Sequence, residues 1–160
     1  MGKLTMKMMT LRGLLLLTLT ALVVPSAGAT EQDNVMKAVR QWVEGLNKGD
    51  TKSAVAACAN ETSIVDEFPP HEWHGEGACA RWVSELEVYN RGLGLTDSHV
   101  TLGKPRRVDI TGDRAYVVAP TEFNFKEHGK PGKEAGALFT VSLKNSPDGW
   151  RITGWAWSRP

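Results

Sequence analysis

The sequence lacks the short motifs that mark most well-known enzyme classes. It has no G-x-S-x-G, no glycine-rich phosphate loop and no H-E-x-x-H, so nothing indicates a serine hydrolase, a nucleotide-binding enzyme or a zinc peptidase. Cysteine and tyrosine occur only twice each among 160 residues. We therefore expect no cofactor and no metal ion.

A hydrophobic run long enough to span a bilayer is also missing. The longest, Gly13–Val24, is short and is followed by Pro25. Three basic residues precede it, no acidic residue occurs before Glu31, and Ala27-Gly28-Ala29 supplies the small residues that signal peptidase requires. We expect a signal peptide over 1–29, cleaved after Ala29, and a periplasmic or secreted protein; an uncleaved anchor is the alternative.

Strong charge of either sign is absent. Three of the 19 Lys and Arg residues lie in the predicted signal, which leaves 16 basic against 18 acidic residues. Nucleic acids and anionic membranes select concentrated positive charge, and the only dense basic run is Lys104-Pro105-Arg106-Arg107. We expect neither a nucleic acid nor, after signal cleavage, a membrane as partner.

Cys58 and Cys79 are the only cysteines. In a chain bound for an oxidising compartment they favour a disulfide. Two buried thiols are one alternative, and a metal site with His71 and His74 is another, although zinc sites favour closer cysteine pairs.

The 131 residues of the predicted mature chain form one domain with a helical first part and a strand-rich second part. Apolar residues spaced by three and four predict helices over 33–46 and 52–59 and a third that opens at Gly77 and ends before Gly92. The remaining patterns predict strands over 62–68, 98–104, 106–110, 115–126, 137–144 and 150–157, with a loop over 71–75. This order implies an α+β fold with helices on one face of a curved sheet.

Three strings resemble the nuclear transport factor 2-like superfamily, including its SnoaL-like and ketosteroid isomerase-like branches. They are QWVEGLNKGD at 41–50, IVDEFP at 64–69 and GWRITGW at 149–155. The resemblance covers essentially the whole mature chain and implies a cone-shaped, cystatin-like roll of antiparallel or mixed strands around a pocket. It implies no single activity, because the superfamily includes isomerases, cyclases, dehydratases and non-catalytic binders.

In the isomerase branch a strand carboxylate removes a proton, while a tyrosine and a protonated aspartate hold the oxyanion. The resemblance assigns the carboxylate to Asp66 and the tyrosine position to Trp42. The aspartate position falls near Ala137, where no acidic residue stands. Since lost oxyanion donors cost orders of magnitude in rate, we do not expect steroid isomerisation.

The segment after Asp66 is dense in chemically active groups. His71, Glu72, Trp73 and His74 follow one another directly. We interpret Asp66, His71 and His74 as a catalytic group in which an imidazole partners the carboxylate in proton transfer. The alternative is that Trp73 plugs the pocket mouth while the imidazoles cap backbone groups or face solvent.

Aromatic residues supply the candidate ligand wall. Trp155 and Trp157 share a strand face, which forms either a ligand wall or a dimer surface. The candidate ligand-binding residues are Trp42, Phe68, Trp73, Tyr89, Glu122, Trp155 and Trp157. For each of them the alternative is an ordinary core or solvent-facing position.

Two functional classes follow. The first is an exported pocket protein that binds a small, largely apolar or aromatic molecule and performs cofactor-free acid/base chemistry through Asp66. The second is a non-catalytic binding module, or one that forms a homodimer through its sheet face.

Overall fold

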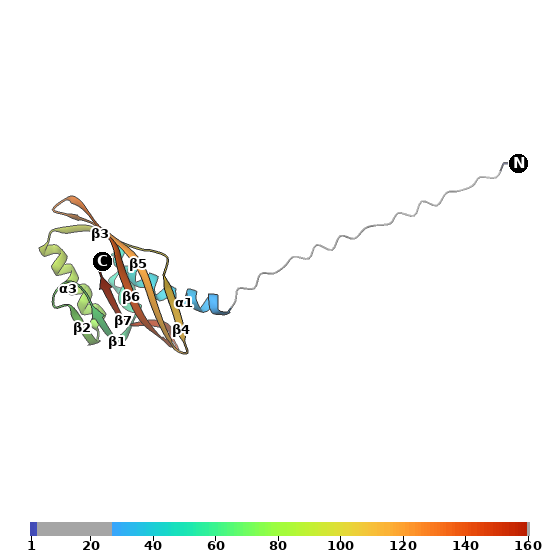
Figure 1. Cartoon of the computed structure of the whole chain (residues 1–160), viewed down its shortest axis with the longest axis horizontal. Helices are drawn as coiled ribbons and strands as arrows, with labels where there is room; N and C mark the ends of the chain where they lie inside the picture. The colour runs from blue at the N-terminus through green and yellow to red at the C-terminus, as the bar shows by residue number, and fades with distance from the viewer. Residues whose placement is uncertain (3–26, 160) are drawn as a thin grey trace.

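A computed structural model describes residues 1–2 and 27–159, and this part of the chain forms three helices and seven strands (Figure 1). Most of the predicted signal peptide, residues 3–26, lies outside the described residues, and residues 27–29 form the start of the first helix. The elements are α1 Ala27–Asn47, α2 Thr51–Ala56, β1 Cys58–Val65, β2 Glu72–Glu76, α3 Ala78–Gly92, β3 Leu95–Leu102, β4 Arg107–Thr111, β5 Arg114–Glu127, β6 Lys130–Ser146 and β7 Gly149–Ser158.

The strands form one mixed sheet in the order β2-β1-β7-β6-β5-β3, with β4 also paired to β5. β1 and β7 run parallel, and all the other pairs in the described part of the chain are antiparallel. The register shifts between Thr121 and Glu122 and between Ser142 and Leu143. Irregularities of this kind bend a sheet, and the predicted α+β fold with a curved mixed sheet is confirmed.

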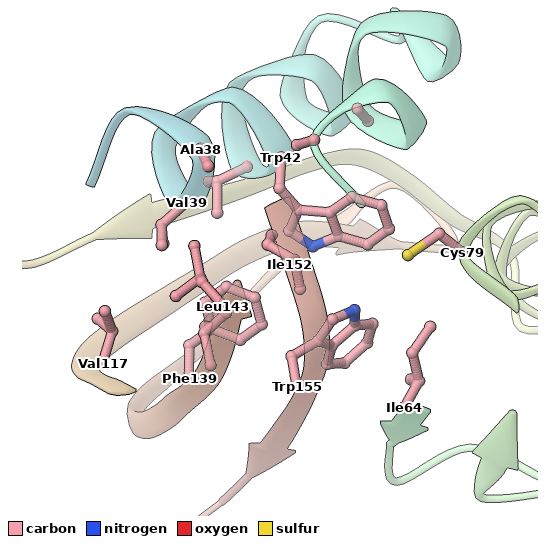
Figure 2. Packing of buried hydrophobic residues seen from close by; sticks show 14 of the residues in the cluster. Ala38, Val39, Trp42, Ile64, Cys79, Val117, Phe139, Leu143, Ile152 and Trp155 are labelled. Carbon is pink, nitrogen blue, oxygen red and sulfur yellow. The ribbon is translucent and has the colours of Figure 1, made fainter. Parts of the chain in front are cut away.

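The helices pack on one side of this sheet. α3 contacts β1, β2 and β3, whereas α1 contacts β3 and β7. Figure 2 shows the core between α1 and the last two strands, where Trp42 lies above Ile152 and Trp155. Burial of these apolar side chains supplies the main favourable free energy of folding.

Local sequence explains how α1 is placed. Its buried residues recur at helical spacing, as predicted. At its end, the Asn47 amide donates to the Val100 carbonyl (2.7 Å) and accepts from the Val100 N–H (2.8 Å), which fixes α1 to β3. At its start, Glu31 accepts a hydrogen bond from Trp150 Nε1 (2.7 Å), which ties the first turns to β7.

Two predicted boundaries differ from the structure at the start of the sheet. The helix predicted to reach residue 59 ends at Ala56, because the chain from Cys58 onward pairs with β7. The Ile152 N–H donates to the Ala57 carbonyl (2.9 Å) at this junction. The strand predicted over 62–68 accordingly begins earlier and ends at Val65.

The predicted loop over 71–75 is wrong, because most of this segment forms β2. It pairs antiparallel with β1, with Ile64 opposite Trp73 and Ser63 opposite His74. A strand alternates its side chains between the two faces. Trp73 is therefore buried, whereas His74 is exposed.

The outer face of the sheet carries exposed apolar side chains, among them Val65 and Tyr116. The homodimer expected through a sheet face stays a prediction. Among the described residues, no helix is long and apolar enough to cross a membrane.

A disulfide joins Cys58, the first residue of β1, to Cys79 in the first turn of α3. The predicted pairing is thus present, and neither cysteine is free. The disulfide ties α3 directly to β1, the strand on which this helix packs.

Replacing both cysteines with serine (C58S/C79S) should lower the free energy of unfolding by about 3 kcal/mol, because a cross-link over a separation of 21 residues restricts the unfolded chain by about this amount. Urea unfolding of the oxidised protein and the double variant measures the difference. Equal stability of the two proteins, or two alkylatable thiols in the native unreduced protein, would contradict this expectation.

Candidate functional site

A cavity of about 480 Å³ opens between α1, α3 and the inner face of the sheet. Its wall is dominated by aromatic rings from both helices, from the turn after β1 and from β5, β6 and β7. These rings belong to Trp42, Phe68, Trp82, Tyr89, Phe123, Phe125, Phe139, Trp155 and Trp157. A largely apolar concavity with a few polar groups is the usual form of a small-molecule site.

Asp66 lies in the cavity wall immediately after the end of β1. Its backbone N–H donates to the His71 carbonyl (2.9 Å), which closes the turn toward β2. Its carboxyl Oδ1 accepts from the Glu67 N–H (2.6 Å), and Oδ2 accepts from Trp82 Nε1 (2.8 Å). A carboxylate oxygen can accept two hydrogen bonds, so each oxygen keeps capacity for a ligand.

The pKa of Asp66 is raised to about 6, chiefly because burial disfavours its charged form. The hydrogen bonds from the Glu67 N–H and from Trp82 act in the opposite direction, since they stabilise the carboxylate. The Glu67 charge raises the pKa and the Arg159 charge lowers it. Burial outweighs the donors, which leaves a group able to hold or release a proton near neutral pH.

Three indoles meet beside Asp66 and form a wall. Ring centroids lie 4.8 Å apart for Trp82 and Trp155, 5.4 Å for Trp42 and Trp82, and 5.8 Å for Trp42 and Trp155. Trp155 Nε1 is buried without a hydrogen-bond partner among the described residues, and Figure 2 shows it on the side nearer Trp42. The indoles line the cavity and leave it open.

Charged groups gather at the edge of the cavity, around the end of β7. The Arg159 N–H donates to Glu67 Oε1 (2.8 Å), and the guanidinium pairs with the same carboxylate. Arg159 Nη1 also lies 3.2 Å from Glu134 Oε1 on β6. The cluster Glu67–Arg159–Glu134 therefore joins the turn after β1, β6 and the residue after β7 along one rim.

Six of the predicted site residues line this cavity together. They are Asp66, Trp42, Phe68, Tyr89, Trp155 and Trp157. The shared face expected for Trp155 and Trp157 is the concave one. Their catalytic and binding roles stay predictions.

The two imidazoles lie elsewhere. His71 is exposed, and its Nδ1 lies 3.2 Å from the backbone carbonyl of Asp66. His74 projects from the outer side of β2 and pairs with exposed Glu72 (3.2 Å). The proposed imidazole–carboxylate pair is not formed, because the β2 register turns His74 away from the cavity and the tight turn holds His71 at the backbone.

Trp73 and Glu122 also lie outside the cavity lining. Trp73 is buried beneath it, where it packs on Phe68 at 4.8 Å between ring centroids and donates to Glu85 Oε2 (2.8 Å) on α3. Glu122 pairs with Lys133 (2.7 Å) on the other face of β5, and this contact holds the pKa of Glu122 below its ordinary value. The regular alternation of β5, which turns Thr121 and Phe123 inward, places Glu122 on the opposite face.

Trp82 was not among the predicted site residues, yet it is the side-chain partner of Asp66. Its helical spacing correctly indicated an inward direction but carried no information about a strand end 16 residues away. The Glu67–Arg159 pair, which spans 92 residues, left no local signal at all.

No group of three or more His, Cys, Asp or Glu side chains is placed to hold a metal ion within residues 1–2 and 27–159. The cysteines are joined to each other, and the His74 imidazole pairs with Glu72.

Solved structures share this architecture. A nuclear transport factor 2-like superfamily protein from Salmonella enterica serovar Typhimurium has a TM-score of 0.70 at 16% identity, over 84% of this chain and 94% of that one. A nuclear transport factor 2-like protein with a cystatin-like fold from Novosphingobium aromaticivorans has a TM-score of 0.67 at 14% identity, over 82% of both chains. A ketosteroid isomerase-like protein from Erwinia carotovora atroseptica has a TM-score of 0.63 at 18% identity, over 81% of this chain and 95% of that one.

No protein-family model and no curated protein sequence matches the chain. At the identities above, the likeness establishes the fold alone: the chain has the nuclear transport factor 2-like, cystatin-like fold that its sequence resemblance implied. This fold carries many unrelated functions, so the chemistry must be argued from the cavity itself.

The ionisation of Asp66 should appear in the pH dependence of stability. Between the ordinary pKa of 3.8 and the folded-state value of about 6, the folded protein keeps a proton that the unfolded chain has lost. The contribution of Asp66 to stability is therefore greatest below pH 4 and is lost as the pH rises through 6, a fall of at most about 3 kcal/mol.

Urea unfolding at pH 4, 5, 6 and 7 measures this effect as the difference between the parent protein and Asp66→Asn, which cannot ionise. Asp148→Asn, in the exposed turn before β7, is the matched control and should follow the parent. A difference between parent and Asp66→Asn that stays constant with pH would show that the carboxyl group is not buried.

Proposed function

We propose that this protein is an exported pocket protein that binds a small, largely apolar, flat molecule and moves a proton on it through Asp66, without a cofactor. The observation that carries the proposal is the Asp66 carboxyl group in the wall of an aromatic cavity, with its pKa raised to about 6. The dimensions and aromatic lining of the cavity favour a ring system of two or three fused or linked rings.

The chemistry that fits is proton transfer next to a carbonyl group. Ionised Asp66 accepts the proton from carbon, and the protonated acid returns it either to a second carbon, as in an isomerisation, or to a departing hydroxyl, as in a dehydration. A general base is most effective when its pKa lies near the working pH, and burial brings Asp66 close to that range.

The oxyanion that forms in such a step has few donors. By the sequence resemblance, the family tyrosine falls on Trp42 and the family's second acid falls near Ala137, which is buried and apolar. Since strong oxyanion donors contribute several kcal/mol, the substrate must yield an already stabilised anion. This requirement favours conjugated or aromatic carbonyl compounds over simple steroids.

A non-catalytic ligand-binding protein is the second candidate. It is favoured by the position of His71 and His74, which contact groups other than the Asp66 carboxyl group and so leave Asp66 to act alone. In this case the carboxyl group would serve only to orient a bound molecule.

Asp66→Asn separates the two candidates. For an enzyme, we expect turnover of conjugated β-hydroxy ketones or enolisable cyclic ketones to fall by about 100-fold or more, with the dissociation constant changed only a few-fold. In the parent, kcat should rise about tenfold per pH unit below pH 6 and level off above it, because the ionised form is the base.

Calorimetry measures binding, and product analysis measures turnover, with Asp148→Asn as the control. If the parent protein binds these compounds but turns over none of them, the non-catalytic ligand-binding function is the one that remains. Failure of all of them to bind would overturn the pocket function.

Export is the remaining part of the proposal. It is supported by the predicted signal peptide and by the Cys58–Cys79 disulfide, since such bonds persist in oxidising compartments. Mass spectrometry of the protein recovered from the periplasm or medium should give a chain that begins at Thr30. A protein that retains residues 1–29 would contradict this expectation.

A further inference from the structure

The cavity is unusually rich in carboxyl groups for one with aromatic walls. Five of its lining residues are acidic, namely Asp66, Glu67, Glu87, Glu127 and Glu134. The basic side chains in the lining are one guanidinium and one imidazole, from Arg159 and His99. The aromatic cavity therefore carries an excess of negative charge.

The single guanidinium is already occupied. Arg159 pairs with both Glu67 and Glu134, and its backbone N–H also donates to Glu67. Two carboxylates around one guanidinium leave no net positive charge to attract an anionic group. The pairing thus argues against a ligand that carries a carboxylate or phosphate.

Two other carboxylates of the cavity lining have no ion-pair partner. The side chains of Glu87 on α3 and Glu127 on β5 form no hydrogen bond or ion pair with any residue that the structure describes. Both are exposed at the rim. Together with Asp66 they place negative charge both at the mouth and in the wall.

Strand alternation separates the charges of the β5–β6 hairpin between its two faces. Phe123, Phe125 and Glu127 line the cavity, whereas two of the three lysines near the tip of the hairpin form ion pairs on its other face. Lys126 pairs with Asp97 (2.7 Å) and Lys133 with Glu122 (2.7 Å). The third, Lys130, is exposed at the hairpin tip, opposite Glu127.

The aromatic wall supplies the second element of cation recognition. The faces of indole rings carry negative electrostatic potential and attract a cation within about 6 Å, most strongly where water is excluded. Trp42, Trp82 and Trp155 meet beside the Asp66 carboxyl group. An ammonium group placed there would lie beside these indoles and a carboxylate.

We propose that the natural ligand is a cation: a flat, largely apolar molecule with one protonated or quaternary amine. The inference rests on the proposed function, namely that the cavity binds a small molecule. It adds the sign of the charge on the ligand, which the fold alone leaves undetermined.

Three probe molecules of similar shape test the sign of the charge that the cavity prefers in its ligand. They are 2-naphthylmethylammonium, the neutral 2-naphthylmethanol and the anion 2-naphthoate, each titrated into the full mature protein at pH 7.5 and low salt by calorimetry. We expect the cation to bind at least about tenfold more tightly than the alcohol, and the anion to bind most weakly.

The outcomes separate the two proposals. Equal or tighter binding of the alcohol, or tightest binding of the naphthoate, overturns the cation inference and leaves the pocket function standing. If none of the three probes binds, both the inference and the pocket function are overturned.

A pair of variants on one strand provides the matched control. Glu127→Gln removes a cavity-side charge, and Glu122→Gln removes an equal charge from the outer face of β5. The first should weaken binding of the ammonium probe about threefold at low ionic strength without affecting the alcohol. Glu122→Gln should change the affinity for neither the ammonium probe nor the alcohol. Equal effects of the two variants on binding of the ammonium probe would mean that only the overall charge of the protein matters.

Discussion

α3 is held against β1 at the two ends of that strand, and the arrangement of the cavity depends on this double attachment. The disulfide fixes Cys79 to the start of β1, and one helical turn later Trp82 donates to Asp66 just past its end. Both attachments lie within the first two turns of α3, and this helix forms one wall of the cavity, with α1 on the other side. The same contact orients the Asp66 carboxyl group in the aromatic wall.

This arrangement has an energetic cost. A carboxyl group surrounded by indoles is harder to ionise than one in water, and the two donors that reach it compensate only in part. Proteins tolerate such costs where a site requires them. The rim follows another pattern, because its charged groups are partly or fully exposed and exposed ion pairs contribute little to stability. Its main effect is on the electrostatic potential that an entering molecule meets.

The sequence predicted most of the fold because its elements follow simple periodicities. The apolar spacing of α1 and the alternation in β5 and β7 identified those elements, and the cysteines were expected to pair. The structure around Asp66 was harder to predict. β2 lies in a segment of histidines, glutamate and glycine, and only pairing with β1 makes it a strand.

The candidate site was predicted only in part, because only some of its side chains lie on elements with a simple periodicity. Side chains on regular elements, such as Trp42 and Trp155, point where their periodicity indicates. The directions of His71 and His74 depend on a turn and on a register that local sequence does not determine. The contacts from Trp82 to Asp66 and from Arg159 to Glu67 join segments far apart in the chain, so only the tertiary structure reveals them.

The bond between Glu31 and Trp150 has a consequence for maturation. Glu31 would be the second residue of a chain cut after Ala29, and its carboxylate is already engaged by the indole on β7. A peptidase that cut two residues further along would release a chain without this anchor, and the first turn of α1 would lose its attachment to the sheet. A cut after Ala29 would retain this carboxylate at the beginning of the first helix, where the helix dipole also favours it.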